Sequence, residues 1–599
     1  MAKHPASNIS IDPSVASIDL SAVRRHLTSS SAAAFSQKQW ERAELEYRQY
    51  LTIRRQFPGR FLMPTGVART VWQAHIVDTR AYRSDCTRIF GRYLDHFPYL
   101  ALSSAQGLQE QQEAESNYTA LLRRQHQNSV QPCSSSPASP SGSDDLGGLA
   151  FQTRPKVVLV ALPWAREGQQ LAPLGHASIA ARLRKDLAIC LEEIVRPVDG
   201  RPFPSATVAA EIMACFAVGD TNSTVAIGAY VWNDDQVKDL VGQLRSLGFS
   251  GRIILGGPQI SYATGGLEQL YPGVDCFVRG AGENALYALV SGRDPVAIAG
   301  VHVAGASDEG IQARADLDSL PSPYLSGLLD PAAGESIHWE TQRGCQFRCS
   351  FCQHRQPGKE SAVIKVDRAR VYAEIDLFCA AKAPRISVLD PIFNRDKQWA
   401  TNILNRFAER GFSGELSLQC RPEMIDSSFL DAAAKLDVIL EFGLQSVVDA
   451  ESHAVNRPNN LRKVEEILSE VQRRGIRHEV SLIYGLPKQT LATFRQSIDW
   501  CLKRNVQTLR AFPLLLLRGT PLADQQLMWG MEVKPGPIPL VTASASFSNE
   551  DWRQMDALAH ALSVTEGAHP SSVEELLTTS ALNSRGSIPA EIRALEKSL

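Results

Sequence analysis

The chain has 599 residues, of which 44% are hydrophobic and 21% are charged, and its formal net charge is −2. This length exceeds what one hydrophobic core supports, so several domains are expected. A balanced charge excludes the basic surface of a nucleic-acid binder and the polybasic patch of a membrane-surface protein. The N-terminus carries no apolar signal segment, and the longest apolar run, Phe512–Leu517, is only strand-sized. We therefore expect a folded cytoplasmic protein.

Residues 1–125 are expected to form a helical N-terminal domain. Apolar and aromatic residues recur at helical spacing over Phe35–Phe57 and over Val71–Tyr93. In the second stretch Trp72 and His75 fall about one turn apart, where their side chains can touch. Two interpretations stay open for this pair, a packing cluster around a satisfied core histidine and a ligand contact.

A flexible linker is predicted at 126–150, a segment rich in Ser, Pro and Gly with little to bury. After it, over 151–310, short apolar runs alternate with helical stretches, which is typical of a parallel sheet covered on both faces. We expect an α/β domain of the Rossmann-like, doubly wound type, whose ligand lies beyond the carboxyl ends of the strands. The expected strands are Lys156–Ala161, Val225–Val231, Arg252–Leu255 and Val274–Val278, and the expected helices are Ala177–Arg184, Asp234–Leu247 and Glu283–Leu289.

A second α/β series occupies 325–540. Six consecutive strand candidates with helical stretches between several of them predict a partial or full (β/α) barrel, with its chemistry at the carboxyl ends of the strands. Residues 541–599 carry helical patterning and are expected to form a C-terminal helical cap. The six strand candidates are the segments HWETQRGC, ISVLDPIF, LSLQCRPE, VILEFGLQS, HEVSLIYGLP and TLRAFPLLLL.

The eleven cysteines divide into two groups. In a chain without a secretion signal, scattered cysteines are expected to be reduced and to behave as small buried hydrophobes. Three others, Cys345, Cys349 and Cys352, form a C-x3-C-x2-C motif directly after a strand candidate. The scattered residues are Cys86, Cys133, Cys190, Cys215, Cys276, Cys379, Cys420 and Cys501.

Three thiolates this close together on one loop suit an iron–sulfur cubane. Four cysteines would close such a cluster, whereas three leave one iron with an open coordination position. A zinc site is the alternative, and it would need a fourth ligand, for which His354 lies near in sequence.

The motif, with Gly344 before it and Phe351 between two of its cysteines, resembles that of the radical S-adenosylmethionine (SAM) superfamily. The resemblance implies a [4Fe–4S] cluster on the three cysteines, SAM bound to the open iron, and Phe351 near the adenine of SAM. Polar residues at later strand ends would then contact SAM or substrate, namely Gln419, Arg421 and Gln445.

An α/β domain directly before such a barrel resembles the cobalamin-dependent branch of this superfamily. The matching residues are Trp232, Asn233, Gly256, Gly257 and Pro258, where glycines let the backbone approach a flat macrocycle. The Asp-x-His-x-x-Gly signature of a lower axial histidine is absent from the domain. Bound cobalamin (methylcobalamin) would therefore lack a histidine ligand, which favours methyl release. A degenerate domain that binds no corrin is the alternative.

Within this branch the commonest activity is C-methylation. In length, domain order and its helical N-terminal piece, the chain resembles the tryptophan 2-C-methyltransferases of thiopeptide antibiotic biosynthesis. That resemblance implies a methyl group moved from SAM to C2 of L-tryptophan, without radical generation. It gives Glu283 a role in capping the cluster, against a plain structural role. Arg69 or Arg166 would lie below cobalt, and Tyr324 would be an indole-facing base or a packing residue at the domain junction.

Other functions remain open for the same sites. One is C-methylation in another natural product, and another is a cobalamin-dependent rearrangement or cyclisation without methyl transfer. A third is a non-catalytic carrier of iron–sulfur or corrin groups, against which the polar set at the barrel mouth argues. As partners we expect a small-molecule substrate and an electron-donor protein, with the chain acting as a monomer.

Overall fold

The computed structural model describes residues 11–29, 35–56, 62–64, 66–90, 155–164, 172–186, 188–216, 222–354 and 363–582. The chain divides into two compact units, residues 1–149 and 150–599. The expected linker at 126–150 and Cys133 lie outside the described residues. No helix within the described ranges is long and apolar enough to cross a membrane.

The described residues of the first unit are mostly helical, and their core is aromatic, with Tyr47 and Trp72 buried in it. His75 lies inside this core, where its Nδ1 is 2.9 Å from the Tyr47 hydroxyl and its Nε2 is 3.3 Å from a carboxylate oxygen of Asp85. Trp72 and His75 are both buried in this core, which favours the packing interpretation of the pair. The helices are α1 (Pro13–Ala16), α2 (Ser21–Ser29), α3 (Gln37–Gln56), α4 (Gly66–Val77) and α5 (Thr79–Phe90).

The helical spacing predicted over Val71–Tyr93 is divided between two helices in its described part. The chain breaks at Asp78 between α4 and α5. There the Asp78 carboxylate accepts a hydrogen bond from the backbone N–H of Ala81 at 3.2 Å. An aspartate that bonds backbone amides in this way starts a new helix, because it satisfies a donor that the first turn leaves unpaired.

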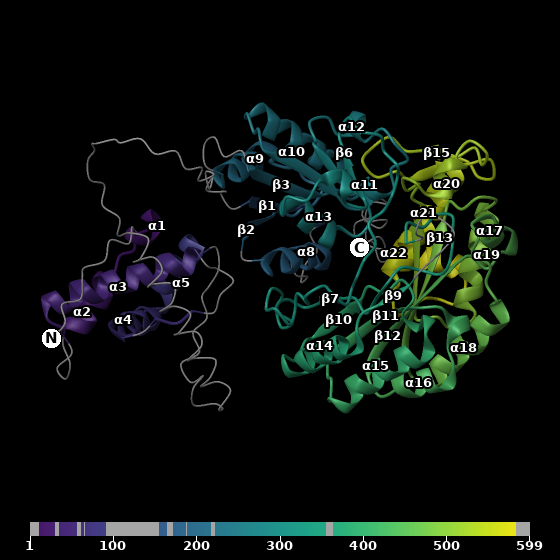
Figure 1. Cartoon of the computed structure of the whole chain (residues 1–599). Coiled ribbons are helices and arrows are strands. Elements are labelled where there is room, and N and C mark those ends of the chain that lie inside the picture. The colour runs from purple at the N-terminus through teal and green to yellow at the C-terminus, as the bar shows by residue number, and fades with distance from the viewer. Residues whose placement is uncertain are drawn as a thin grey trace. The chain divides into compact units, whose positions relative to one another are not determined.

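In the second unit the first sheet is the predicted doubly wound one (Figure 1). Its strand order is β2-β1-β3-β4-β5-β6, parallel except for β6, which runs antiparallel to β5. The order reverses between β1 and β3, so the ligand crevice of such a sheet lies at their carboxyl ends. The elements are β1 (Lys156–Ala161), α8 (Leu174–Arg184), β2 (Cys190–Val195), α9 (Ser205–Ala214), β3 (Ser223–Gly228), α10 (Asp234–Ser246), β4 (Arg252–Gly256), α11 (Pro258–Ser261), α12 (Leu267–Leu270), β5 (Cys276–Val278), α13 (Gly282–Val290) and β6 (Val301–Val303).

The sequence pattern missed strand β2, and its position explains why. With the sequence CLEEIV it lies at the edge of the sheet and is only partly buried, so it shows no continuous apolar run. Cys190, its first residue, is exposed, which corrects the expectation that all scattered cysteines are buried. Cys215 and Cys379 are only half-buried.

The second sheet contains all six predicted strands and runs parallel throughout, in the order β14-β13-β12-β11-β10-β7. Helices cover its outer face, which gives a partial barrel (Figure 1). The elements of this region are β7 (Ile337–Trp339), β8 (Gln342–Arg343), β9 (Ile364–Lys365), α14 (Arg368–Ala380), β10 (Arg385–Val388), α15 (Lys397–Glu409), β11 (Glu415–Cys420), α16 (Ser427–Ala433), β12 (Asp437–Gln445), α17 (Asp449–Ala454), α18 (Leu461–Arg473), β13 (Arg477–Tyr484), α19 (Leu491–Leu502) and β14 (Thr508–Pro513). Strands β8 and β9 pair with each other in a separate antiparallel sheet.

The C-terminal segment closes the open side of this sheet near β14. Trp552 and Leu558 of its long helix are buried in the barrel core, and the Tyr484 hydroxyl of β13 donates to the Asp556 carboxylate at 2.5 Å. The predicted helical patterning is thus present, preceded by a short hairpin. The elements are α20 (Pro521–Asp524), β15 (Glu532–Val533), β16 (Val541–Ala543), α21 (Asn549–Val564) and α22 (Val573–Leu582).

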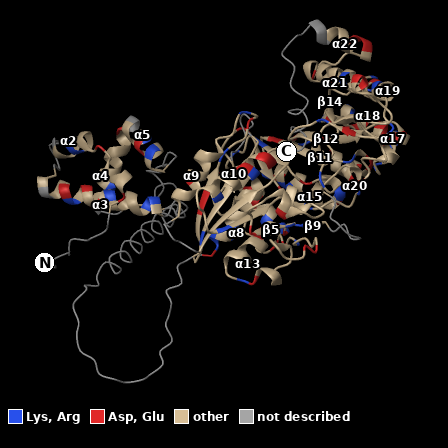
Figure 2. Cartoon of the chain, turned by 90° about the horizontal axis from the view of Figure 1, so that it is seen from above, with Lys and Arg blue, Asp and Glu red and all other residues tan. Residues whose placement is uncertain are grey.

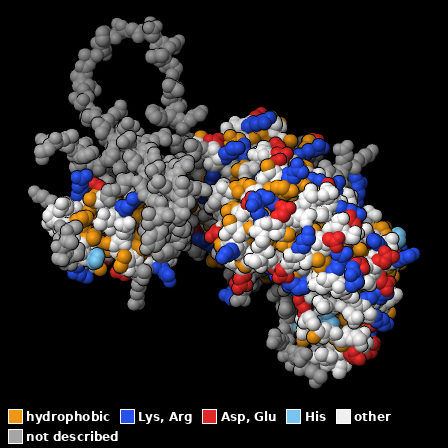
Figure 3. All heavy atoms as spheres, turned by 90° about the horizontal axis from the view of Figure 1, so that it is seen from below, with side chains coloured by type: hydrophobic (Ala, Val, Ile, Leu, Met, Phe, Trp, Pro, Cys, Tyr) orange, Lys and Arg blue, Asp and Glu red, His pale blue; other side chains and the backbone are white. Residues whose placement is uncertain are grey.

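Polar contacts join the two sheets of the second unit. The Arg518 guanidinium, after β14, donates to the Gln259 carbonyl at 2.9 Å and lies 3.3 Å from the Asp234 carboxylate. On the described surface, charges of both signs are interspersed along the ribbons (Figure 2) and among hydrophobic atoms on the face drawn in Figure 3. This distribution agrees with the small net charge of the whole chain.

Candidate functional site

The three clustered cysteines lie on the loop after β7, at the carboxyl end of the barrel sheet. Gly344, directly before Cys345, has φ +96°, a conformation that residues with side chains rarely adopt. Cys349 is buried, and Cys345 and Cys352 are half-buried. All three line one cavity of about 950 Å³. The structure therefore brings the predicted thiols to one site.

Buried polar contacts fix the shape of the cysteine loop. The Asp390 carboxylate, just after β10, accepts hydrogen bonds from the backbone N–H groups of Thr341 at 2.8 Å and Gln342 at 3.1 Å. Burial raises the pKa of Asp390 to about 7, even though these hydrogen bonds lower it. On the other side, the Ser350 N–H donates to the Val455 carbonyl at 2.9 Å. The loop is thus held from both flanks.

Two arginines lie beside the cysteines. The Arg457 guanidinium donates to Cys349 Sγ at 3.6 Å, and its Nε donates to the Gly443 carbonyl at 3.2 Å. The Arg421 guanidinium lies over the Phe347 ring, 4.2 Å from its centroid, and Arg421 is itself buried. Positive charge at these positions stabilises thiolates and other anions bound in the same cavity.

The donor set fits a group larger than one ion. Burial raises the pKa of Cys345 and raises that of Cys352 to about 12, so ligation must displace their protons. Within the ranges that the structure describes, no three His, Cys, Asp or Glu residues are arranged to hold a single metal ion. Zinc would need its ligands within about 2.3 Å of one point. Three thiols that line one cavity suit a multi-iron cluster, whereas the zinc alternative requires His354 as its fourth ligand.

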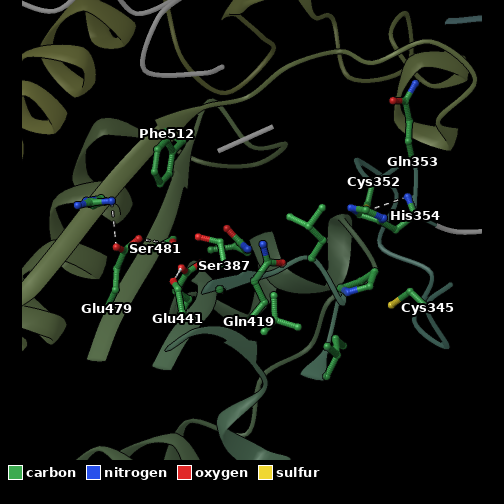
Figure 4. A pocket seen from close by; sticks show the side chains of 18 of the residues that line it. Cys345, Cys352, Gln353, His354, Ser387, Gln419, Glu441, Glu479, Ser481 and Phe512 are labelled. Carbon is green, nitrogen blue, oxygen red and sulfur yellow. Dashed lines mark hydrogen bonds and ion pairs between the residues drawn. The ribbon is translucent and has the colours of Figure 1, made fainter. Parts of the chain in front are cut away.

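The barrel strands supply the deeper wall of the cavity. Figure 4 shows Ser387, Gln419, Glu441 and Ser481 pointing into the same space from four neighbouring strands. Gln445 also lines the cavity, and its φ is +68° at a bulge of β12. Such an irregularity re-aims a side chain at the rim of a barrel. Gln419 and Gln445 thus lie in the cavity, as predicted, together with Arg421 and Phe351.

The doubly wound domain supplies the opposite wall. Tyr230 and Trp232, directly after β3, stack with their ring centroids 4.5 Å apart, and both line the cavity with Pro258. Trp232 Nε1 donates to the Leu162 carbonyl at 3.1 Å, which joins the ends of β1 and β3 at the reversal of strand order. A flat aromatic platform at this crevice suits a macrocycle. Among the described residues of this domain, those that line the cavity include no histidine.

The other residues of this domain that were predicted to bind cobalamin, Asn233, Gly256 and Gly257, fix the turns at the strand ends. Gly257 has φ +94°, and a Cβ there would lie 2.7 Å from the Ala229 carbonyl oxygen, so only glycine fits. Gly256 ends β4 beside Gly228. Asn233 is fully buried, and its side-chain amide donates to the Gly228 carbonyl at 3.1 Å. These three residues do not line the cavity. They place Pro258 and Trp232, which do.

Glu283, predicted to cap the cluster, forms an ion pair instead. Its buried carboxylate lies 3.0 Å from Arg343 Nη2 and accepts a hydrogen bond from the Ser178 hydroxyl at 3.3 Å. Burial raises the pKa of Glu283, but the neighbouring Arg343 guanidinium outweighs this and leaves it below its ordinary value. Arg343 stands two residues before Cys345, so the pair links the doubly wound domain to the cysteine loop. This arrangement favours the structural alternative for Glu283.

Of three other predicted residues, one packs in the barrel core, one belongs to the first unit and one lies outside the described residues. Tyr324 is buried in the barrel core, where its hydroxyl donates to the His338 carbonyl at 2.5 Å and its ring packs edge-on against Phe378. These contacts favour the packing alternative for Tyr324. Arg69 lies on α4 of the first unit, with its Nε donating to the Pro64 carbonyl at 3.1 Å. Arg166 lies outside the described residues.

Sequence reasoning missed Arg457 and Glu441. Arg457 stands in the connection between α17 and α18, which carries no motif, so no sequence signal marks it. Glu441 could have been found, because alternate residues of a strand face the same side and Glu441 is four residues before the predicted Gln445 on β12.

Comparison with known proteins agrees with this geometry. Residues 339–501 match the model of the radical SAM superfamily, and residues 17–133 match a family described as UCP032817-like. The cobalamin-dependent radical SAM methyltransferase TokK of Streptomyces tokunonensis is 27% identical over 327 residues, which is 50% of this chain and 47% of TokK. The 2-(S-pantetheinyl)-carbapenam-3-carboxylate methyltransferase of Streptantibioticus cattleyicolor is 24% identical over 66% of this chain and 62% of its own length. The chain thus spans about half to three fifths of these relatives.

Solved structures show the same fold at low sequence identity. The radical SAM methyltransferase TsrM of Kitasatospora setae, with tryptophan and a SAM analogue bound, superposes with a TM-score of 0.52 at 17% identity, covering 65% of this chain and 80% of TsrM. The cobalamin-dependent SAM radical enzyme OxsB superposes with a TM-score of 0.51 at 14% identity, covering 74% of this chain and 72% of OxsB. The chain shares their architecture of a doubly wound sheet followed by a partial barrel.

Proposed function

We propose that the chain is a cobalamin-dependent radical SAM methyltransferase, which moves a methyl group from SAM to a carbon atom of a small molecule. The observation that carries the proposal is the cavity of about 950 Å³, which the C-x3-C-x2-C thiols share with the Tyr230 and Trp232 platform. The relatives TokK and the carbapenam methyltransferase support the proposal by their activities. The cofactors would be a [4Fe–4S] cluster, cobalamin and SAM.

The residues present fit these groups. Cys345, Cys349 and Cys352 would hold three irons of the cluster, and the Tyr230 and Trp232 platform would support the corrin. When bound, the cluster supplies electrons and an open iron for SAM, and cobalamin supplies a carrier for the methyl group. Tyr230, Trp232 and Pro258 are the residues through which the described part of this domain would contact the corrin.

The chain itself would position the reactants and exclude water. Arg421 and Arg457 place two positive charges at the cysteine end of the cavity, where they can hold an anionic group and the thiolates. Phe351 and the aromatic platform give that end an apolar wall, which strengthens the electrostatic interactions within it. Holding both reactants in one cavity reduces the entropy cost of bringing them together.

For the substrate, L-tryptophan is the first compound that we propose to test. The chain shares the TsrM fold, and the TsrM structure holds tryptophan as a substrate. The carbapenam methyltransferase acts on a different compound, so its substrate is the second compound to test. Both would place the reaction in antibiotic biosynthesis. The lower-face role of Arg69 or Arg166 stays a prediction for the holoenzyme.

The test is a substrate panel with the full-length holoenzyme, SAM and a reductant, followed by mass spectrometry. We expect SAM consumption and a product heavier by one CH2 for at least one amino acid, peptide or carbapenam. The Cys349→Ala variant, which lacks a cluster ligand, is the control and should give no product. A product without the added CH2 would instead indicate a rearrangement or cyclisation. Holoenzyme that never consumes SAM with any compound would contradict catalysis altogether.

A further inference from the structure

A row of polar side chains crosses the barrel wall of the cavity. Glu441 on β12 is paired in register with Gln419 on β11 and with Glu479 on β13. Neighbouring strands lie about 4.8 Å apart, so the two carboxylates are adjacent on the same face of the sheet. All three residues line the cavity, and Figure 4 shows Glu441 between Gln419 and Glu479.

Among the described residues, the ion pairs near this row do not balance the negative charge of its two carboxylates. Glu479 lies 3.1 Å from an Arg510 nitrogen, but Arg510 also pairs with Glu566 at 2.7 Å. One guanidinium therefore serves two carboxylates. Glu441 accepts a hydrogen bond from the Ser417 hydroxyl, and no lysine, arginine or histidine pairs with it among the residues that the structure describes. A hydroxyl neighbour leaves the negative charge of Glu441 uncompensated.

Adjacent like charges on a sheet destabilise it, and a cation placed between them removes the repulsion. The same cavity also presents apolar side chains, among them Ile483, Phe512 and Leu514. A cavity with one unbalanced carboxylate beside apolar side chains is complementary to a molecule with a positive group on an apolar or mixed body.

We propose that Glu441 binds the ammonium group of an amine substrate, with Ser417 and Gln419 as neighbouring polar contacts. This inference rests on the proposed function and names the substrate class of the same cavity. An ammonium group donates up to three hydrogen bonds, which the Glu441 carboxylate and the Gln419 side-chain oxygen can accept. Charge-assisted hydrogen bonds of this kind are stronger than neutral ones. The substrate would thus be fixed by its amine, leaving a distant carbon free to react.

The experiment measures binding by calorimetry to the full-length holoprotein, without turnover. The probes are tryptamine, putrescine and glucosamine, each compared with its fully N-acetylated derivative, which has the same body without an ammonium group. Glu441→Gln is the test variant, because it keeps the size of the side chain and removes its charge. Glu335→Gln is the matched control, since Glu335 lines the same cavity but is exposed to solvent.

We expect at least one amine to bind the wild-type protein and the Glu335→Gln variant, and to bind Glu441→Gln at least tenfold more weakly. Its fully N-acetylated form should bind all three proteins equally weakly. The proposal is overturned if no amine binds the wild-type protein, if Glu441→Gln binds as well as wild type, or if only Glu335→Gln loses binding. Iron and corrin contents measured in the same samples test the proposed function separately, because amine binding needs no turnover.

Discussion

Cys349 is the buried member of the cysteine motif and the one that Arg457 contacts. Replacing it with alanine removes one of three ligands, so Cys349→Ala should lose the visible absorption of the cluster and most of its iron and sulfide. The control is Cys379→Ala, a half-buried cysteine on α14 outside the cavity, which should keep the cluster. Normal iron and sulfide in Cys349→Ala would refute the ligand assignment.

Arg457 donates to the sulfur of Cys349, and hydrogen bonds to cluster sulfurs help to set its reduction potential. Such a donor stabilises the more negative, reduced cluster. Arg457→Met should therefore lower the midpoint potential by tens of millivolts, and Arg457→Lys should lower it less. A redox titration followed by electron paramagnetic resonance measures this shift.

The matched control for this titration is Arg462→Met, because the Arg462 side chain is 91% exposed on α18 and should leave the potential unchanged. Equal potentials in wild type and Arg457→Met would show that the contact does not tune the cluster. A loss of cluster content without a shift in potential would assign Arg457 a merely structural role.

At the scale of elements, the polar contacts around the cysteine loop give it a pH dependence. The pKa of Asp390 is about 7 in the folded protein, because burial raises it, and about 3.9 when unfolded. Between about pH 3.9 and about pH 7, Asp390 thus keeps its proton in the folded state and loses it in the unfolded state. This contribution to stability is full below about pH 4 and is lost as the pH rises through about 7.

Asp390→Asn cannot ionise and still offers an oxygen to the N–H groups of Thr341 and Gln342. At a pH of about 8 it should therefore raise Tm by a few degrees, as expected for roughly 1 kcal/mol, and it should change Tm less at about pH 5. Thermal melts of the holoprotein at both pH values measure this difference. Asp449→Asn, an exposed position on α17, is the control. A lower Tm for Asp390→Asn at both pH values would show that the charge is required.

The pair of Glu283 and Arg343 joins the doubly wound domain to the cysteine loop. The Glu283 side chain is 6% exposed and that of Arg343 is 29% exposed, so losing one partner should cost roughly 1–2 kcal/mol, less than for a fully buried pair. Glu283→Gln should lower Tm while leaving the SAM-bound spectrum of the cluster unchanged. Because the folded pKa of Glu283 is depressed, the stability from this pair is present above about pH 4.3 and lost as the pH falls below that value.

A double variant separates the two roles of Glu283. If Glu283 acts through Arg343, adding Arg343→Gln to Glu283→Gln should lower Tm by less than the sum of the two single effects. Additive effects on Tm, together with a changed cluster spectrum in Glu283→Gln, would instead support the capping role that sequence resemblance implied.

Several elements could be predicted from the sequence because the residues that determine them are close together in the chain. The apolar strands and the cysteine spacing are visible in sequence, and all six barrel strands were found. Strand β2 was missed because an edge strand needs no continuous apolar run, and the break at Asp78 was missed because helical spacing continues across it. Period-two patterning along β12 could have placed Glu441 in the cavity.

Residue roles that depend on tertiary contacts were not predictable. Glu283 and Arg343 are 60 residues apart, and only the fold makes them an ion pair. Arg457 reaches Cys349 across 108 residues from a connection without a motif. Tyr324 had two open interpretations because burial at a domain junction depends on how the two sheets of the second unit pack together.

In the whole molecule, the proposed activity depends on one cavity that is lined by residues from the domains of both six-stranded sheets. The cysteine loop and the aromatic platform lie far apart in sequence, and both line that cavity. A protein that bound only the cluster, or only the corrin, would leave either the aromatic platform or the cysteine loop without a function. The proposed activity therefore requires both cofactors in the same protein at the same time.

The most direct test follows the methyl group. Full-length protein is reconstituted with iron, sulfide and hydroxocobalamin, passed through gel filtration, and given a reductant with methyl-labelled SAM. We expect corrin to stay with the protein in stoichiometric amount, and label to enter the corrin fraction as S-adenosylhomocysteine forms. Protein that retains the cluster but no corrin, or that retains both while all label stays in SAM, would contradict the central claim.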